Sequence, residues 1–101
     1  MVKKLHLPKI LIFEWDNGNL EHIKKHKAEH DECEDVFFDN PLYFADEKHS
    51  EKEDRFLGYG LTNGNRLLMV VFTIRNDKIR VVSARDQHKK EREIYKRNKR
   101  S

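Results

Sequence analysis

Cysteine is almost absent from this chain of 101 residues, and long apolar runs are missing. The lone Cys33 has no partner within the chain, which excludes an internal disulfide and makes a reducing cytoplasm the simplest setting. No apolar run approaches the ~20 residues that a membrane-spanning helix needs. The run Ile10–Phe13 is too short for the apolar part of a signal peptide. We therefore expect a cytoplasmic protein without a membrane segment, in which Cys33 is a small helix residue and not a nucleophile.

Several motifs of enzyme chemistry are also missing. The sequence has no glycine-rich phosphate loop, no Gly-x-Ser-x-Gly elbow and no Cys-x-x-Cys pair, so we expect no nucleotide cofactor. His22, His26 and His30 stand four residues apart, a spacing at which two histidines can share a metal on a helix. No cysteine accompanies them, and Asp31 is expected to begin a new helix. We therefore expect a polar histidine face and no metal.

What the chain has in abundance is charge, and the charge is distributed unevenly. Charged residues make up 39% of the sequence, and the formal net charge is +3. Residues 14–54 carry five basic and fourteen acidic side chains, whereas residues 55–101 carry thirteen basic and four acidic ones. A basic half favours a polyanionic partner, and an acidic half favours a basic partner or solvent. The alternative is a solvated ionic surface, such as that of a heat-stable protein.

The apolar pattern predicts an α+β fold with one small core, in which a strand and two helices precede a β-meander and a last helix. The expected elements are strand 10–15, helix 16–26, helix 31–39, strand 42–44, strands 55–62, 66–75 and 78–84, and helix 86–97. Asp16 or Asn17 caps the first helix, Asp31 with Glu34 forms a capping box for the second, and Asp86 caps the last.

Side-chain alternation divides the expected sheet into two faces. A tight turn at Asn76-Asp77 places Arg75 and Arg80 together on the face that points away from the core. This second face is apolar at one end and cationic at the other, while the first is an ordinary core under the N-terminal helices. If Asn63-Gly64 is a two-residue turn, the glycines of strand 55–62 form a shallow floor on the second face.

Arginines at the end of the last hairpin indicate phosphodiester chemistry, because arginine keeps its charge and binds phosphate through paired donors. RNA cleavage without a metal needs a base, an acid and cations around a phosphorane. We expect Arg75, Arg80 and Arg85 to supply the cations, although each is equally suited to a surface ion pair. Tyr95 can stack on a base or donate a proton. The candidates for proton transfer near neutral pH are His26, His49 and His88.

An ordered set of short motifs runs through the chain: Phe13-Glu14-Trp15-Asp16, Lys25-His26, Val36-Phe37, Asn40-Pro41, His49-Ser50, Glu53-x-Arg55, Gly58, Thr73-x-Arg75, Ile79-Arg80, Ser83-Ala84-Arg85, Glu91-Arg92 and Tyr95. In this order and at these spacings, the set resembles the BrnT toxins of type II toxin–antitoxin systems. The resemblance covers residues 10–97, and with the basic C-terminal tail we expect one toxin domain over 1–101. It implies a RelE-like fold and a ribonuclease that cleaves RNA and inhibits translation.

The resemblance also implies partners. A cognate BrnA antitoxin, a ribbon-helix-helix protein, would neutralise the toxin, and the complex would bind operator DNA mainly through the antitoxin. The chain departs from the family pattern at three places. Lys27 stands where a glycine commonly follows Lys-His, Gly18-Asn19 where a lysine is usual, and Asp86-Gln87 where Lys-Ala or a similar pair is usual.

The motif match and the cationic face together define the expected site. Arg75 and Arg85 are assigned to binding of the phosphate and the transition state, and His26 or His49 to proton transfer. Tyr95 is assigned to the catalytic group as a substrate-positioning residue. The expected RNA-binding side chains are Lys25, Lys78, Arg80, Lys89 and Arg92. Two alternatives are a non-catalytic module that docks nucleic acid or an acidic protein on the same basic face, and a structural subunit of a larger complex.

Overall fold

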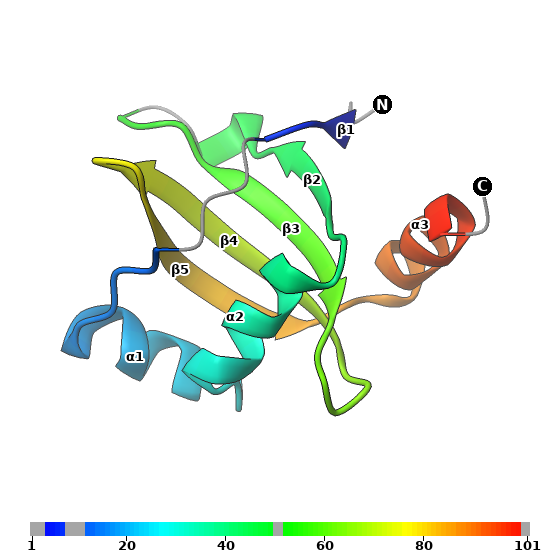
Figure 1. The fold of residues 1–101 in the computed structure, drawn as a ribbon, viewed down its shortest axis with the longest axis horizontal. Helices are drawn as coiled ribbons and strands as arrows, with labels where there is room; N and C mark the ends of the chain where they lie inside the picture. The colour runs from blue at the N-terminus through cyan, green and yellow to red at the C-terminus, as the bar shows by residue number, and fades with distance from the viewer. Residues whose placement is uncertain (1–3, 8–11, 50–51, 100–101) are drawn as a thin grey trace.

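The computed structural model describes residues 4–7, 12–49 and 52–99, and these residues form an α+β fold (Figure 1). Its centre is a five-stranded sheet in the order β1-β2-β3-β4-β5, in which all neighbouring strands are antiparallel. The elements in chain order are β1 (Lys4–Leu5), α1 (Asn17–Lys24), α2 (His30–Phe38), β2 (Leu42–Ala45), the 3-10 helix η1 (Glu47–His49), β3 (Phe56–Leu61), β4 (Leu67–Arg75), β5 (Lys78–Asp86) and α3 (Lys89–Lys99). The expected α+β class and the meander of β3, β4 and β5 are confirmed.

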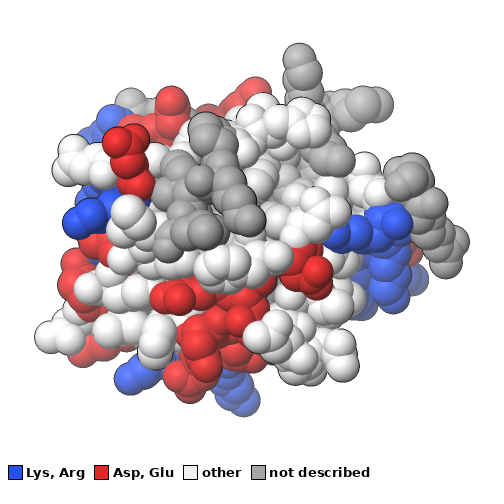
Figure 2. Space-filling view, in the orientation of Figure 1, with Lys and Arg blue, Asp and Glu red and all other residues white. Residues whose placement is uncertain are grey.

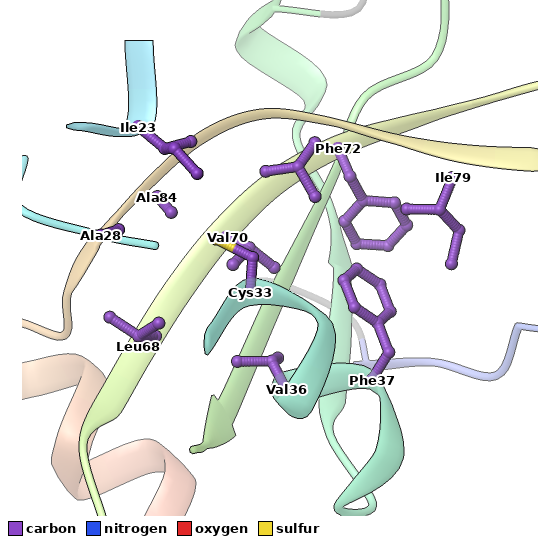
Figure 3. Close-up of a cluster of buried hydrophobic side chains, with 11 residues drawn as sticks. Ile23, Ala28, Cys33, Val36, Phe37, Leu68, Val70, Phe72, Ile79 and Ala84 are labelled. Carbon is purple, nitrogen blue, oxygen red and sulfur yellow. The ribbon is translucent and has the colours of Figure 1, made fainter. Parts of the chain in front are cut away.

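The main core lies between one face of the sheet and the helices α1 and α2, which cover that face (Figures 1 and 3). Figure 3 shows Phe37 of α2 directed toward Phe72 of β4, and the two rings meet edge to face at 4.9 Å. The buried side chains of this core are Ile23, Ala28, Cys33, Val36, Phe37, Leu68, Val70, Phe72, Ile79, Val81 and Ala84. Burial raises the pKa of the Cys33 thiol to about 12, so Cys33 is a core residue, as expected, and no thiolate.

A second, smaller core occupies the apolar end of the opposite sheet face. Tyr95 of α3 is buried there against Leu42, Phe44, Tyr59 and Met69. This packing anchors α3, whose remaining surface is strongly basic, to the sheet. None of the described helices is long and apolar enough to cross a bilayer.

The hairpin of β4 and β5 forms as expected. Asn76 and Asp77 both have positive φ values, 50° and 62°, which is the backbone of a type I′ turn. The turn pairs Arg75 with Lys78, and the register then shifts between Val71 and Phe72, where β5 carries one extra residue. In a regular strand, Arg80 and Arg85 would point to opposite faces, because they are five positions apart. The bulge at Val82 reverses the alternation, so both side chains point to the same sheet face.

The hairpin of β3 and β4 differs from the expectation of a two-residue turn. Thr62 still pairs with Arg66, so three residues form the loop, and the last of them, Asn65, has a φ of 67°. The extra residue moves Gly58 and Gly60 to the main core, where they pair with Val70 and Leu68. A Cβ on Gly60 would lie 2.7 Å from Val36 Cγ1, so this glycine lets α2 approach the sheet closely.

Two helix starts also differ from the predictions. The helix α2 begins after Glu29, whose backbone N–H donates to the Glu32 carboxylate, so the predicted box of Asp31 with Glu34 is wrong. Asp31 instead lies in the first turn, where its charge is favourable. Asp86 does not cap α3, because its carboxylate binds Arg66 and its backbone still belongs to β5.

The N-terminal segment reaches both edges of the sheet. Lys4 and Leu5 pair with β2 at one edge, and Phe13 forms an isolated parallel bridge with Ile79 of β5 at the other. The predicted strand 10–15 is therefore reduced to this bridge in the part of it that is described, since residues 10 and 11 lie outside the described ranges. The predicted cap at Asp16 is confirmed, because its carboxylate accepts from the Asn19 backbone N–H at 3.2 Å.

Candidate active site

A cleft of about 240 Å³ lies where the start of α1 meets the ends of β4 and β5. The connection before β3 forms its third wall. The lining residues are Gly18, Asn19, His22, Glu53, Arg55, Arg75, Arg80 and Val82. The cleft thus collects three arginines, one histidine and one carboxylate from parts of the chain that are far apart in sequence.

Asn19 fixes α1 beside this cleft. It is buried, and its side-chain amide donates to the carbonyl oxygens of Glu14 and Val81, both at 3.0 Å. These bonds satisfy a polar group inside the protein and tie the first turn of α1 to the edge strand β5. His22 follows Asn19 by three residues and therefore projects from the same side of the helix into the cleft.

Arg80 lies on the α1 side of the cleft. Its guanidinium donates to the Asp16 carboxylate at 2.8 and 3.1 Å and to Glu14 at 3.1 Å. The hydrogen bond from Arg80, followed by the one from the Asn19 backbone, holds the pKa of Asp16 below its ordinary value. Arg80 is therefore a cation that the cap of α1 positions.

Arg75 lies on the opposite wall and is a diagonal cross-strand neighbour of Arg80. It binds Glu53 through two donors, at 2.9 Å from Nε and 2.6 Å from Nη2. This pairing lowers the pKa of Glu53. A guanidinium presents the same fork to a phosphate as to a carboxylate. Arg75 and Arg80 each bind a carboxylate through two N–H donors, and the same two donors can bind two oxygens of a phosphate.

Arg85 does not belong to this cleft, which corrects the predicted cluster of Arg75, Arg80 and Arg85. It is paired with Met69, six residues from Arg75 along β4, which corresponds to about 20 Å. Its guanidinium binds the Glu91 carboxylate at 2.7 and 3.0 Å and so links β5 to α3. Sequence spacing alone could not reveal this separation, because the bulge and the strand length decide it.

Tyr95, Lys89 and Arg92 all lie on α3, at the end of the sheet away from the cleft. Tyr95 is buried in the smaller core, and burial raises its pKa. Arg92 donates to the Gln87 carbonyl at 2.7 Å, while Lys89 is exposed at the start of the helix. The structure therefore does not place these three predicted site residues together with Arg75.

Lys25 and Lys78 are exposed, and each is near a lining residue of the cleft in the sequence or across the hairpin. Lys78 is the cross-strand partner of Arg75, and Lys25 follows His22 by three residues at the end of α1. Neither lysine is a lining residue of the cleft.

The histidine that lines the cleft is His22 and not the predicted His26. His26 is exposed one turn beyond His22, with 5.9 Å between the two ring centres, but it is not a lining residue of the cleft. His49 ends η1, and its side chain lies outside what the structure describes. His30 contacts Trp15 instead of the other two histidines, and among the described residues no group of three or more potential ligands could hold a metal.

Sequence reasoning did not assign His22, Glu53 or Arg55 to the site. The motif Glu53-x-Arg55 was the available signal, because both of its charged residues line the cleft. In the sequence His22 belongs to the candidate metal-binding face, whereas in the structure it lines the cleft together with Arg80.

The uneven charge of the sequence appears on the surface. Figure 2 shows acidic side chains gathered over α2 and basic ones over α3. The acidic residues within α2 are Asp31, Glu32, Glu34 and Asp35.

A family model for the ribonuclease toxin BrnT of type II toxin–antitoxin systems matches residues 15–91. This match spans most of the chain, and the chain therefore belongs to the BrnT family of ribonuclease toxins. No curated protein matches the chain. The matched range contains every lining residue of the cleft and ends at Glu91, the partner of Arg85.

Proposed function

We propose that this toxin is a metal-independent endoribonuclease that cleaves RNA in the cytoplasm and thereby inhibits translation. The observation that carries the proposal is the cleft in which Arg75 and Arg80 are diagonal neighbours on one sheet face. Two fixed positive charges at this spacing suit a phosphate that becomes more negative as a phosphorane forms. Lys78 and Lys25 extend the positive charge toward the flanking backbone of the RNA.

The proposed catalytic set is smaller than the one expected from sequence. Arg85 and Tyr95 are assigned here to the attachment of α3, because one is bound by Glu91 and the other is buried. His26 is not a lining residue of the cleft, and the side chain of His49 lies outside what the structure describes, so neither is included in this set. Lys89 and Arg92 remain candidates for contacts with RNA outside the cleft, on the basic helix α3.

The partners follow from the family. We propose a RelE-like relationship for the fold and a BrnA-like ribbon-helix-helix antitoxin that neutralises the toxin. On this proposal the complex binds operator DNA mainly through the antitoxin. The support is the type II toxin–antitoxin system to which the family belongs.

The test is cleavage of a defined messenger RNA by the purified protein in the presence of EDTA. Arg75→Ala is expected to lower the rate about 10²–10³-fold, as loss of one donor to a developing oxyanion commonly does. The matched control is Arg97→Ala, which removes an exposed arginine from α3. A ribbon-helix-helix protein encoded beside the toxin gene should abolish the wild-type activity. Equal rates for Arg75→Ala and wild type would remove the cleft from the mechanism, and salt-sensitive binding of intact RNA would favour a non-catalytic module.

A further inference from the structure

Besides its arginines, the cleft contains one carboxylate and one imidazole, those of Glu53 and His22, to which the proposed function has not yet given a role. Glu53 comes from the connection before β3, and His22 comes from α1, so the fold brings them together over 31 positions of sequence. Metal-free RNA cleavage requires one group that accepts a proton and one that donates a proton. Arginine is a poor choice for either task because it does not release its proton in proteins.

Glu53 is present as an anion close to the expected phosphate. Its two carboxylate oxygens contact Nε and Nη2 of Arg75 at 2.9 and 2.6 Å. The hydrogen bond from Arg75 comes first among the effects that lower its pKa, and the charges of Arg55 and Arg80 act in the same direction. The side chain is one-third exposed, so solvent and substrate can reach it.

His22 lines the cleft from α1, the helix whose cap Asp16 binds Arg80. The charged groups near it are Arg80 with its partners Asp16 and Glu14, the lining residues Glu53, Arg55 and Arg75, and on α1 itself Lys25 and His26. The imidazole of His22 is exposed and can exchange its proton with water. Histidine is the side chain best suited to give up a proton near neutral pH.

We propose that Glu53 is the general base and His22 the general acid of RNA cleavage, an inference that rests on the proposed ribonuclease function. The Glu53 carboxylate takes the proton of a ribose 2′-hydroxyl as the 2′-oxygen bonds to the adjacent phosphorus. The bond from phosphorus to the 5′-oxygen then breaks, and the His22 imidazolium gives its proton to that oxygen. The products are a 2′,3′-cyclic phosphate and a 5′-hydroxyl, and solvent returns Glu53 and His22 to their starting states.

The ion pair with Arg75 gives this assignment a physical basis. A phosphate that takes over the Arg75 fork displaces the Glu53 carboxylate, which then lies next to the phosphate that is attacked. Once the Arg75 hydrogen bonds are lost, the pKa of Glu53 returns toward its ordinary value, and the carboxylate becomes a stronger base. Substrate binding therefore releases and activates the base in one step.

The test measures cleavage of a short RNA as a function of pH. Glu53→Gln and His22→Asn are each expected to lower the maximal rate about 10²–10³-fold. Glu53→Gln should remove the acidic limb of the pH–rate profile and His22→Asn the alkaline limb. The matched controls are Glu47→Gln and His6→Asn, which change exposed residues outside the cleft and should keep the wild-type rate and profile.

Each outcome has a defined meaning. Both variants change side chains at the surface, so circular dichroism should match the wild type, and RNA binding should persist. If the wild type cleaves RNA but a variant retains the full rate and both limbs, that residue is not the acid or base, and the inference fails alone. If the wild type yields a 3′-phosphate without a cyclic intermediate, the attack by the 2′-hydroxyl is wrong. If the wild type does not cleave RNA at all, the proposed function itself fails.

Discussion

The two ends of one sheet face use the same chemical pair for different purposes. At one end Arg85 binds Glu91, and at the other Arg75 binds Glu53, each through two hydrogen bonds. The Arg85 and Glu91 side chains are 29% and 15% exposed, whereas those of Arg75 and Glu53 are 47% and 34% exposed. The first pair links β5 to the packed helix α3, and the second borders a cleft.

Pairing with a carboxylate therefore does not by itself decide whether an arginine is structural. What decides it is whether a substrate anion can replace the carboxylate. Glu91 is held by its own burial and by the His88 backbone N–H, so a phosphate cannot easily displace it. Glu53 is one-third exposed and lines the cleft, so a ligand that enters the cleft can replace it at the Arg75 guanidinium.

The largest expected effect is at the packed end. Tyr95→Ala should lower the free energy of unfolding by about 3 kcal/mol, because it leaves a cavity among Leu42, Phe44, Tyr59 and Met69. Urea denaturation followed by circular dichroism measures the change, and Tyr95→Phe, which keeps the ring, is the control. An unchanged urea midpoint for Tyr95→Ala would show that α3 does not depend on this core.

A smaller effect separates the two ion pairs directly. Arg85→Ala should lower the free energy of unfolding by about 2 kcal/mol, because it strands a mostly buried carboxylate at Glu91. Arg75→Ala should have a smaller effect on stability than Arg85→Ala, because solvent screens the pair of Arg75 with Glu53. The same denaturation measurement compares the two variants. Equal losses of stability would remove the distinction between the packed end and the cleft.

The smallest effect concerns pH. Burial raises the pKa of Glu91, but the hydrogen bonds from Arg85 and from His88 outweigh it, and the net pKa is lowered. Glu91 therefore contributes stability above its unfolded pKa of roughly 4.3 and loses this contribution as the pH falls through the folded value. Glu91→Gln should make the fall in stability between pH 7 and pH 3 smaller by about 1 kcal/mol.

The control for the pH experiment is Glu53→Gln. The pKa of Glu53 is also lowered, but solvent screens its pair with Arg75. The Glu53→Gln substitution should therefore change the pH dependence of stability less than Glu91→Gln does. A larger effect for Glu53→Gln than for Glu91→Gln would reverse the assignment of the structural end.

The parts of this fold that were predictable are those in which sequence neighbours interact. The Asn76-Asp77 turn, the cap at Asp16 and the alternation that unites Arg75 with Arg80 are all local consequences of residue type. The three-residue loop after Thr62 and the bulge at Val82 were not, because an extra residue in a strand or turn leaves no local signature.

In the site, too, only the contacts within one hairpin were predictable from the sequence. The cationic pair lies on one hairpin and could be placed, but its partners are Glu53, Glu14 and Asp16, which only the tertiary packing brings near. The side chain of His22 could be placed only after the buried amide of Asn19 had fixed α1 on β5. Long-range contacts of this kind therefore decide which histidine and which carboxylate enter the cleft.

The N-terminal segment has a consequence for the way this small protein avoids unwanted association. An unpaired strand edge is a template on which another chain can add a strand. Residues 4–5 occupy the β2 edge, and residues 12–14 hydrogen-bond to the β5 edge, at Ile79. One stretch of chain thus covers backbone groups on both outer sides of the sheet. Loss of that stretch would expose the paired part of β2 and the backbone of Ile79 at the same time, and so create two new places where another strand could add.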